Sequence, residues 1–387
     1  MPAVSIECYV ENSAISHEQL FSDIREQFKE DDIIHSFNEL VTLRKNELIQ
    51  IYPGLRNGNL ATIFEAPQSI NHIKKQAIKS INLYWHHLEK TAIELFGDIL
   101  ACWAHYERFC ILHKYKAIPI SLFSNVPYDE SKYRSEMIDR IENDERKFYT
   151  LYCNASLTLT DANTLININS LIIDQKWYEM LFSISLSQES RHFILYYTDN
   201  YNRLVLVSAS LIQGWDKRKK WLSFEPFFQG KHWKSCITED SRSKLYHLGI
   251  FNDLVLNDNI TLWFEDSLKD YIKDPSNVCE IVRFSVCGSK YLRLFLLYFA
   301  QKELMKRLVE SHFYVSYMIT DQPFFMSFYQ STDDICYIID SYRSIQNSKY
   351  YIFKGFLDHK TVGDKLTRSN FKEFRLAAIK SLRNKDD

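Results

Sequence analysis

Glycine is scarce in this chain, which has 387 residues and only nine glycines. It contains neither the Gly-x-Gly-x-x-Gly turn of dinucleotide-binding folds nor the Gly-Lys-Thr/Ser loop that holds phosphates. The sequence therefore gives no support for a dinucleotide-binding domain or a P-loop nucleoside triphosphatase. A glycine-rich pyrophosphate cradle is also missing, because only Gly288-Ser289 separates a candidate strand from the apolar helix that follows it.

An excess of charge is absent as well. The formal net charge is −2, which provides no field to attract nucleic acid or an anionic membrane. The first ten residues lack a basic segment followed by an apolar one. The most apolar run, Leu292 to Ala300, is interrupted by Arg293 and is too short to cross a bilayer. We expect a soluble, cytoplasmic protein with no membrane span and no bulk nucleic-acid binding.

The eight cysteines show no Cys-x-x-Cys pair and no Cys/His spacing typical of a metal site. We expect reduced thiols that mostly pack, and neither a metal ion nor a cofactor. Cys279, beside Glu280, is a possible nucleophile. A neighbouring carboxylate raises the pKa of a thiol, however, so a small buried apolar residue is the favoured interpretation.

The first part of the chain has helical patterns. Ser16-His17-Glu18-Gln19 has the form of a capping box, with apolar residues at four-residue steps after it. Between Ser69 and Pro119 apolar residues recur three and four apart, which predicts one very long helix or two that meet near Gly97. We place a domain boundary near residue 145, giving a helical N-terminal domain over 1–145 and a second domain over 146–387.

Beyond that boundary the period of the apolar residues changes to that of strands. Residues 148–160 are strand-rich, and the segments 193–197 and 204–212 read as a hairpin. The next elements are expected in the order strand, helix, strand, strand, at 278–286, 291–310, 313–320 and 335–339. Hairpin strands followed by strands joined through a helix predict an α+β fold with a mixed sheet flanked by helices.

The strand 278–286 carries two charges among apolar residues. Burying a charge in a sheet costs several kcal/mol unless the charge is paired or functional, so Glu280 and Arg283 need an explanation. On a regular strand they face opposite sides, with Phe284 on the side of Glu280 and with Ile281 and Ser285 on the side of Arg283. Each charge would then need its own partner.

The pattern Glu-x-x-Arg-Phe-x-Val at 280–286, followed by a turn, a helix and a strand ending in Thr320-Asp321, resembles the second half of acyl-homoserine-lactone synthases. The chain length, the helical first half and the segment 221–228 resemble the LuxM/AinS type more than the shorter LuxI type. This resemblance implies an acetyltransferase-like mixed sheet. It also implies an enzyme of quorum sensing that transfers an acyl group from acyl carrier protein or acyl-CoA to the amine of S-adenosylmethionine, closes the lactone and releases methylthioadenosine.

The resemblance also assigns roles to individual residues. Glu280 matches the family's glutamate, a base for the amine proton. Arg283 matches its arginine, which either fixes a carboxylate or phosphate or holds the sheet by an ion pair. Thr320 corresponds to a threonine near the acyl chain, and Phe284 is a further substrate-binding candidate. The alternative for Thr320 is that Asp321-Gln322-Pro323 simply makes a turn after it.

The adenosylmethionine site of the LuxI type does not carry over, because the strand 204–212 lacks the arginine of that type. A sulfonium favours an aromatic face and a carboxylate. The candidates are therefore aromatic, acidic or neighbouring residues of the second domain: Trp177, Asp199, Arg203, Trp215, Trp221 and Glu225. Asp199 is also explained as a turn residue, and the tryptophans as packing residues.

Four consecutive basic residues stand between Trp215 and Trp221: Lys217, Arg218, Lys219 and Lys220. An acidic acyl carrier protein or the phosphates of coenzyme A would suit them, and a solvated loop is the plain alternative. Two other functions are also compatible with the sequence. One is a CoA-dependent N-acyltransferase with another amine substrate, and the other is a non-catalytic interaction protein with a degenerate acyltransferase-like domain.

Overall fold

The computed structural model describes residues 93–97, 99–120, 126–174, 191–216, 233–257, 268–320, 336–344 and 351–376. Within these ranges ten strands form one mixed sheet. The strands are β1 (Tyr133–Asp139), β2 (Lys147–Thr150), β3 (Cys153–Thr158), β4 (Arg191–Thr198), β5 (Leu204–Gly214), β6 (Lys234–Ser235), β7 (Val278–Val286), β8 (Val315–Thr320), β9 (Tyr337–Ser344) and β10 (Tyr351–Asp358). The α+β class predicted from the sequence is confirmed.

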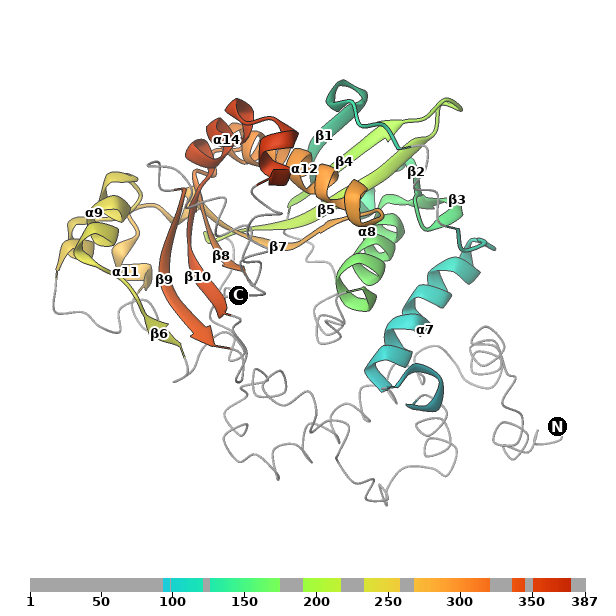
Figure 1. Cartoon of the computed structure of the whole chain (residues 1–387), viewed down its shortest axis with the longest axis horizontal. Helices are drawn as coiled ribbons and strands as arrows, with labels where there is room; N and C mark the ends of the chain where they lie inside the picture. The colour runs from blue at the N-terminus through green and yellow to red at the C-terminus, as the bar shows by residue number, and fades with distance from the viewer. Residues whose placement is uncertain are drawn as a thin grey trace, which may run out of the picture.

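The helices of the described ranges lie around this sheet (Figure 1). They are α7 (Ile99–Lys114), α8 (Leu159–Asn167) with the π-helix η4 (Ile168–Ile173), α9 (Glu239–His247), α11 (Leu268–Tyr271), α12 (Lys290–Glu310) and α14 (His359–Arg368). Short 3-10 turns complete them: η2 (Glu130–Lys132), η3 (Ile141–Asn143), η8 (Asp253–Leu256) and η9 (Pro275–Asn277). None of these helices is both long and apolar enough to cross a bilayer.

The strand order is β1-β4-β5-β7-β8-β10-β9-β6, with β2 and β3 attached beside β5. The hairpin of β4 and β5 is antiparallel, as the sequence predicted. β7 and β8 are parallel and are connected through α12, so the predicted strand, helix, strand order is also confirmed. The first strand, β1, was missed: it lies before residue 145 and pairs with β4. The division into two domains stays a prediction.

The two faces of the sheet carry different helices. Tyr133 of β1 packs against Phe295 and Phe299 of α12, which lies beside α14 (Figure 1). On the opposite face Ser285 of β7 donates a hydrogen bond to Asn167 of α8 at 2.7 Å. We call these the α12 face and the α8 face. Residues directly opposite each other on neighbouring strands have their side chains on the same face of the sheet. The strand register therefore assigns the described sheet residues to the α12 face or the α8 face.

Two apolar clusters fix these layers. The larger one joins α7, α8 and α12 to the sheet. The smaller one gathers Trp215, Phe251, Tyr317 and Phe356 under α9. Before α7, residues 93–96 form a helical turn that ends at Gly97, where φ is +78° and the Gly97 N–H donates to the Ile93 carbonyl at 2.8 Å. One continuous helix through Gly97 is therefore excluded. The expected helices before residue 93 lie outside the described residues.

Candidate active site

Glu280 lies on the α8 face of β7 and is only 3% exposed. Its ladder partners are Gln213 of β5 and Tyr317 of β8. The pair Glu280 and Tyr317 is the last of three in the parallel ladder between β7 and β8, and no later pair joins the described residues of these two strands. Glu280 therefore stands at the end of this ladder, and beyond it the facing backbone groups of β7 and β8 are not paired with each other among the described residues.

Arg283 occupies a β-bulge three residues further along. Two residues, Arg283 and Phe284, oppose the single residue Ser210, because Val282 pairs with Leu211 and Ser285 pairs with Ala209. Arg283 has φ of +55°, unusual for a residue with a Cβ, and the Ser210 hydroxyl donates to the Val282 carbonyl at 3.1 Å. Arg283 is buried. Bulges of this kind re-aim a side chain next to functional sites.

The bulge corrects the expectation that Glu280 and Arg283 face opposite sides. Alternation along the strand is interrupted at Arg283, so Phe284 now shares the α12 face with Ile281, and both pack against the larger core cluster. Ser285 lies on the α8 face with Glu280. The charge of Arg283 acts on His192, whose ladder partner Leu211 pairs with Val282 on that same face. Regular alternation therefore does not place the two charges on opposite sides of the sheet.

A second carboxylate, Asp340 of β9, lies on the same face and is 1% exposed. It accepts hydrogen bonds from the hydroxyls of Tyr317 at 2.6 Å and Ser341 at 2.7 Å. Burial, and next the charge of Asp340, holds the pKa of Tyr317 well above its usual value, and Glu280 also contributes to this shift. Tyr317 thus stays protonated and lies within the electrostatic reach of both carboxylates.

Asp340 is presented by a second bulge. The register between β9 and β10 shifts so that Gly355 pairs with Ile339 and Lys354 with Ser341, which leaves Asp340 as the extra residue. A Cβ on Gly355 would lie 2.2 Å from the carbonyl oxygen of Ile338. Only glycine permits this close approach of the two backbones.

Aromatic and cationic groups surround these acids. The ring of Trp215 lies 5.8 Å from that of Tyr317 and 6.5 Å from that of Phe356. Lys354, which is buried, places its ammonium 4.3 Å from the ring centre of Trp233, within the range of a cation–π contact. An apolar strand also contributes His192, which is 1% exposed. Burial, and next the charge of Arg283, lowers the pKa of His192 to about 4, so the imidazole is neutral at pH 7.

Sequence reasoning missed Tyr317, Asp340, Lys354 and His192. The signal was present for three of them, since each is a polar or charged residue inside an apolar strand pattern, the criterion that identified Glu280. Tyr317 gave no such signal, because a tyrosine in a strand is ordinary packing.

The remaining predicted residues have varied positions. Trp215 is buried beside Tyr317 on the α8 face. Thr320 ends β8 and pairs with Phe353. Asp199 lies in the turn at the far end of the β4 and β5 hairpin, where it accepts hydrogen bonds from Arg203 and from the backbone of Tyr201. Several predicted residues lie outside the described residues: Trp177, Lys217, Arg218, Lys219, Lys220, Trp221 and Glu225.

The thiols of the described residues are free, and Cys279 is fully buried. Burial, and next the charge of Glu280, raises the pKa of Cys279 well above its usual value. Cys279 is therefore a protonated core residue rather than a nucleophile. No cluster of histidine, cysteine and acidic side chains that could hold a metal ion occurs in the described part of the chain.

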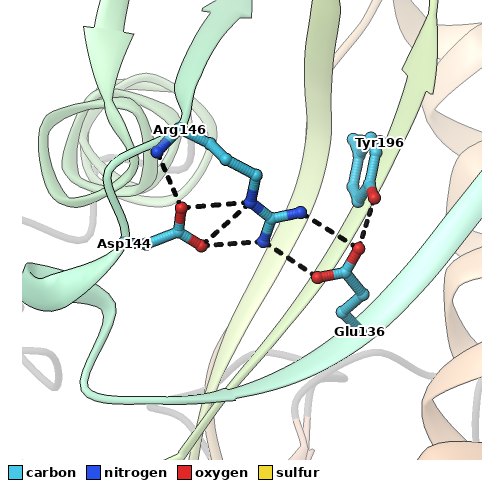
Figure 2. Close-up of polar contacts among 4 residues, drawn as sticks. All are labelled: Glu136, Asp144, Arg146 and Tyr196. Atoms are coloured by element: carbon cyan, nitrogen blue, oxygen red, sulfur yellow. Dashed lines mark hydrogen bonds and ion pairs between the residues drawn. The ribbon is translucent and has the colours of Figure 1, made fainter.

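A different polar network lies on the same face, towards the edge strand β1 (Figure 2). The guanidinium of Arg146 binds Glu136 through hydrogen bonds of 2.8 and 3.1 Å and Asp144 through bonds of 2.7 to 3.2 Å. Tyr196 donates its hydroxyl to Glu136. The hydrogen bond to Arg146 lowers the pKa of Asp144, and the bonds from Arg146 and Tyr196 outweigh burial to lower the pKa of Glu136.

Comparison with known proteins connects this geometry to a chemistry. A family model described as acyl homoserine lactone synthase matches residues 17–386. Acyl-homoserine-lactone synthase OpaM of Vibrio parahaemolyticus is 30% identical over 342 residues, which are 88% of this chain and 86% of that protein. The acyl-homoserine-lactone synthases LuxM of Vibrio campbellii and Vibrio harveyi are each 28% identical over 344 residues, with the same shares. No solved structure gives a significant match.

Proposed function

The chain belongs to the acyl-homoserine-lactone synthase family, and we propose that it assembles its product on the α8 face of β7, with Glu280 as the base and Arg283 as the anion-binding residue. It is an acyltransferase of quorum sensing, and its substrates are S-adenosylmethionine and an acyl donor. The observation that carries the proposal is the burial of Glu280 at the last pair of the β7 and β8 ladder.

The first step forms the amide. The α-amine of S-adenosylmethionine attacks the carbonyl carbon of an acyl thioester, a C–N bond forms, the C–S bond breaks and the thiol leaves. Glu280 accepts the proton that the amine loses, a task for a carboxylate placed in a low-dielectric site. Backbone N–H groups of β7 and β8 beyond their last shared pair are of the type that stabilises the oxyanion of such a reaction.

The second step closes the ring. The methionine carboxylate attacks its own γ-carbon, a C–O bond forms, the bond from that carbon to the sulfonium breaks, and methylthioadenosine leaves. Arg283 is suited to orient the carboxylate, because a guanidinium binds a carboxylate through two parallel hydrogen bonds. The bulge presents Arg283 three residues from Glu280 on the same strand, so an amino-acid zwitterion bound there has a complementary charge for each of its two ends.

The acyl chain of the substrate is assigned to the α12 face, beside the point where β7 and β8 separate. Ile281 and Phe284 of β7, Met318 of β8 and Phe353 of β10 are partly buried against the larger core cluster. This apolar strip beneath α12 suits an acyl chain, and Thr320 ends the strand that borders it. Acyl carrier protein and acyl-CoA both fit as donors. The basic run from Lys217 to Lys220 is proposed to dock either of them and lies outside the described residues.

Glu280→Gln tests the proposal, because it keeps the side-chain shape and removes the base. Loss of a general base typically lowers the rate about 100- to 10,000-fold. The measurement is mass spectrometry of acyl-homoserine lactones in organic extracts of expressing cells, with purified enzyme assayed on several acyl donors. The exposed Glu239, changed to Gln, is the matched control and should leave production unchanged.

Three outcomes separate the possibilities. Lactone from the wild type and the Glu239 variant but not from Glu280→Gln, with equal thermal melts, supports the assignment. Full activity of a folded Glu280→Gln variant refutes the role of Glu280. A wild-type protein that acylates another amine, or none, would point to the other N-acyltransferase or to the binding module.

A further inference from the structure

His192 is a buried imidazole on β4 whose two ring nitrogens have no hydrogen-bond partner among the described residues. Its side chain is 1% exposed and its neighbours in the strand, Phe193, Ile194 and Leu195, are fully buried. A neutral imidazole offers one N–H donor and one acceptor. Leaving both unused inside a core costs stability, so a ligand that uses them is a physical reason for a histidine at this position.

The sheet register brings His192 to the proposed active site. His192 pairs with Leu211, and Leu211 pairs with Val282, so His192 and Val282 share the α8 face two strand spacings apart. Arg283 follows Val282 directly at the bulge, and Glu280 precedes Val282 by two residues on that face. Two spacings are about 10 Å, which an arginine side chain largely covers. Burial, and next the charge of Arg283, lowers the pKa of His192, in keeping with this proximity.

The positive charge of Arg283 limits which ligands can contact both Arg283 and His192. A cation beside a guanidinium is repelled, whereas an anion held by the guanidinium attracts the adjacent imidazole N–H. Resting on the function proposed above, we propose that His192 donates a ring N–H to the methionine carboxylate of S-adenosylmethionine, the group that Arg283 binds. His192 and Arg283 then form a two-donor carboxylate site on β4 and β7.

His359 shows what a purely structural histidine looks like in this protein. It is as deeply buried as His192, but its Nδ1 makes a 2.9 Å hydrogen bond to the Phe313 carbonyl. That bond ties the start of α14 to the segment before β8. The contrast with His192 provides a matched control, because both residues are buried, neutral imidazoles in one molecule.

The experiment measures binding rather than turnover. His192→Phe removes both nitrogens, His192→Gln keeps an N–H donor, and His359→Gln is the control. Each folded variant is titrated by calorimetry with S-adenosylmethionine and with its decarboxylated analogue, which lacks only the carboxylate. We expect His192→Phe to weaken S-adenosylmethionine binding about 10- to 100-fold, the range for one hydrogen bond to a charged group. Binding of the analogue should not change, and His192→Gln should recover most of the loss.

The unaltered protein provides a second measurement in case His192→Phe does not fold. In protein labelled with nitrogen-15 histidine, the His192 ring signals should shift on adding S-adenosylmethionine and not on adding the analogue, while the His359 signals stay in place.

Equal weakening of both ligands, weakening of neither, or unshifted His192 signals would overturn the inference while leaving the synthase function intact. Failure of the wild type to bind S-adenosylmethionine or make lactone would instead overturn the function proposed above.

Discussion

Two polar clusters lie on the same face of one sheet, and they differ in how their charges are satisfied. Near the edge strand β1, Arg146 neutralises Glu136 and Asp144 at once, and the three residues are close in sequence (Figure 2). The side chains of Arg146 and Glu136 are partly open to solvent, at 37% and 36% exposure, and that of Asp144 is 9% exposed. In the centre, Glu280, Arg283, Asp340 and His192 are almost completely buried and come from β4, β7 and β9.

From this difference we expect the edge cluster to serve stability and the central cluster to serve chemistry. An ion network that is local in sequence and partly exposed has a small desolvation cost, and here it fixes a loop to a strand. The central cluster is buried, and its charged residues come from strands far apart in the sequence, with two of them at bulges. Removing these charges from water costs free energy that the stability of the fold does not explain. We therefore expect substitutions at the edge cluster to lower stability without altering catalysis, and those at the central cluster to alter catalysis.

The largest expected effect comes from Gly355→Ala. The added Cβ would lie 2.2 Å from the Ile338 carbonyl oxygen, so the bulge that presents Asp340 must rearrange. We expect a loss of about 3 kcal/mol in the free energy of unfolding, measured with urea, together with loss of lactone synthesis. Gly249→Ala, at a position where nothing lies within 4 Å of the added Cβ, tests the strain of a positive φ alone and should retain synthesis. A fully active Gly355→Ala enzyme would show that the Asp340 bulge is dispensable.

A pair of tyrosines sharpens the comparison. Tyr317 donates its hydroxyl to Asp340 in the central cluster, and Tyr196 donates to Glu136 in the edge cluster. Tyr317→Phe should lower kcat/KM roughly tenfold, because a buried carboxylate loses a hydrogen bond worth about 1.5 kcal/mol. Tyr196→Phe should change only the unfolding midpoint. Steady-state kinetics of both purified variants decide the matter, and equal kinetic effects would contradict the division into two roles.

The smallest effect is expected for Arg146→Met, which removes the cation of the edge cluster. We expect a loss of about 1 to 2 kcal/mol of unfolding free energy at pH 7 and normal kcat/KM. The folded-state pKa values of Glu136 and Asp144 lie below their unfolded values, so their contribution is present above about pH 4 and is lost as the pH falls further.

Urea denaturation of the wild type and Arg146→Met from pH 7 to pH 3 measures this dependence. The gap in stability between the two proteins should therefore be largest at pH 7 and shrink as the solution is acidified. A gap that grows on acidification would mean that the network does not depress these two pKa values.

Much of the fold could be predicted from local patterns. The hairpin of β4 and β5, the helix α12 and the parallel strands on either side of it follow from periodicity and turn residues. β1 was missed because it lies at the edge of the sheet, where one side faces solvent and its sequence Tyr-Arg-Ser-Glu-Met-Ile-Asp is too polar to look like a strand. Glu280 was found by the same reasoning that marks any charge inside an apolar strand.

By itself, the sequence determined the class of the fold and the family and marked Glu280 as a candidate acid, because periodicity, motif and a misplaced charge are all local properties of the chain. Only the tertiary structure decided which groups meet. Two bulges, at Arg283 and Asp340, reverse the regular alternation of side chains between the two faces of the sheet. No local residue pattern predicts these bulges. Register across six strands, from β4 to β9, then brings His192, Glu280, Tyr317 and Asp340 to one face. Register is set by packing and pairing over long separations, which a single strand does not encode.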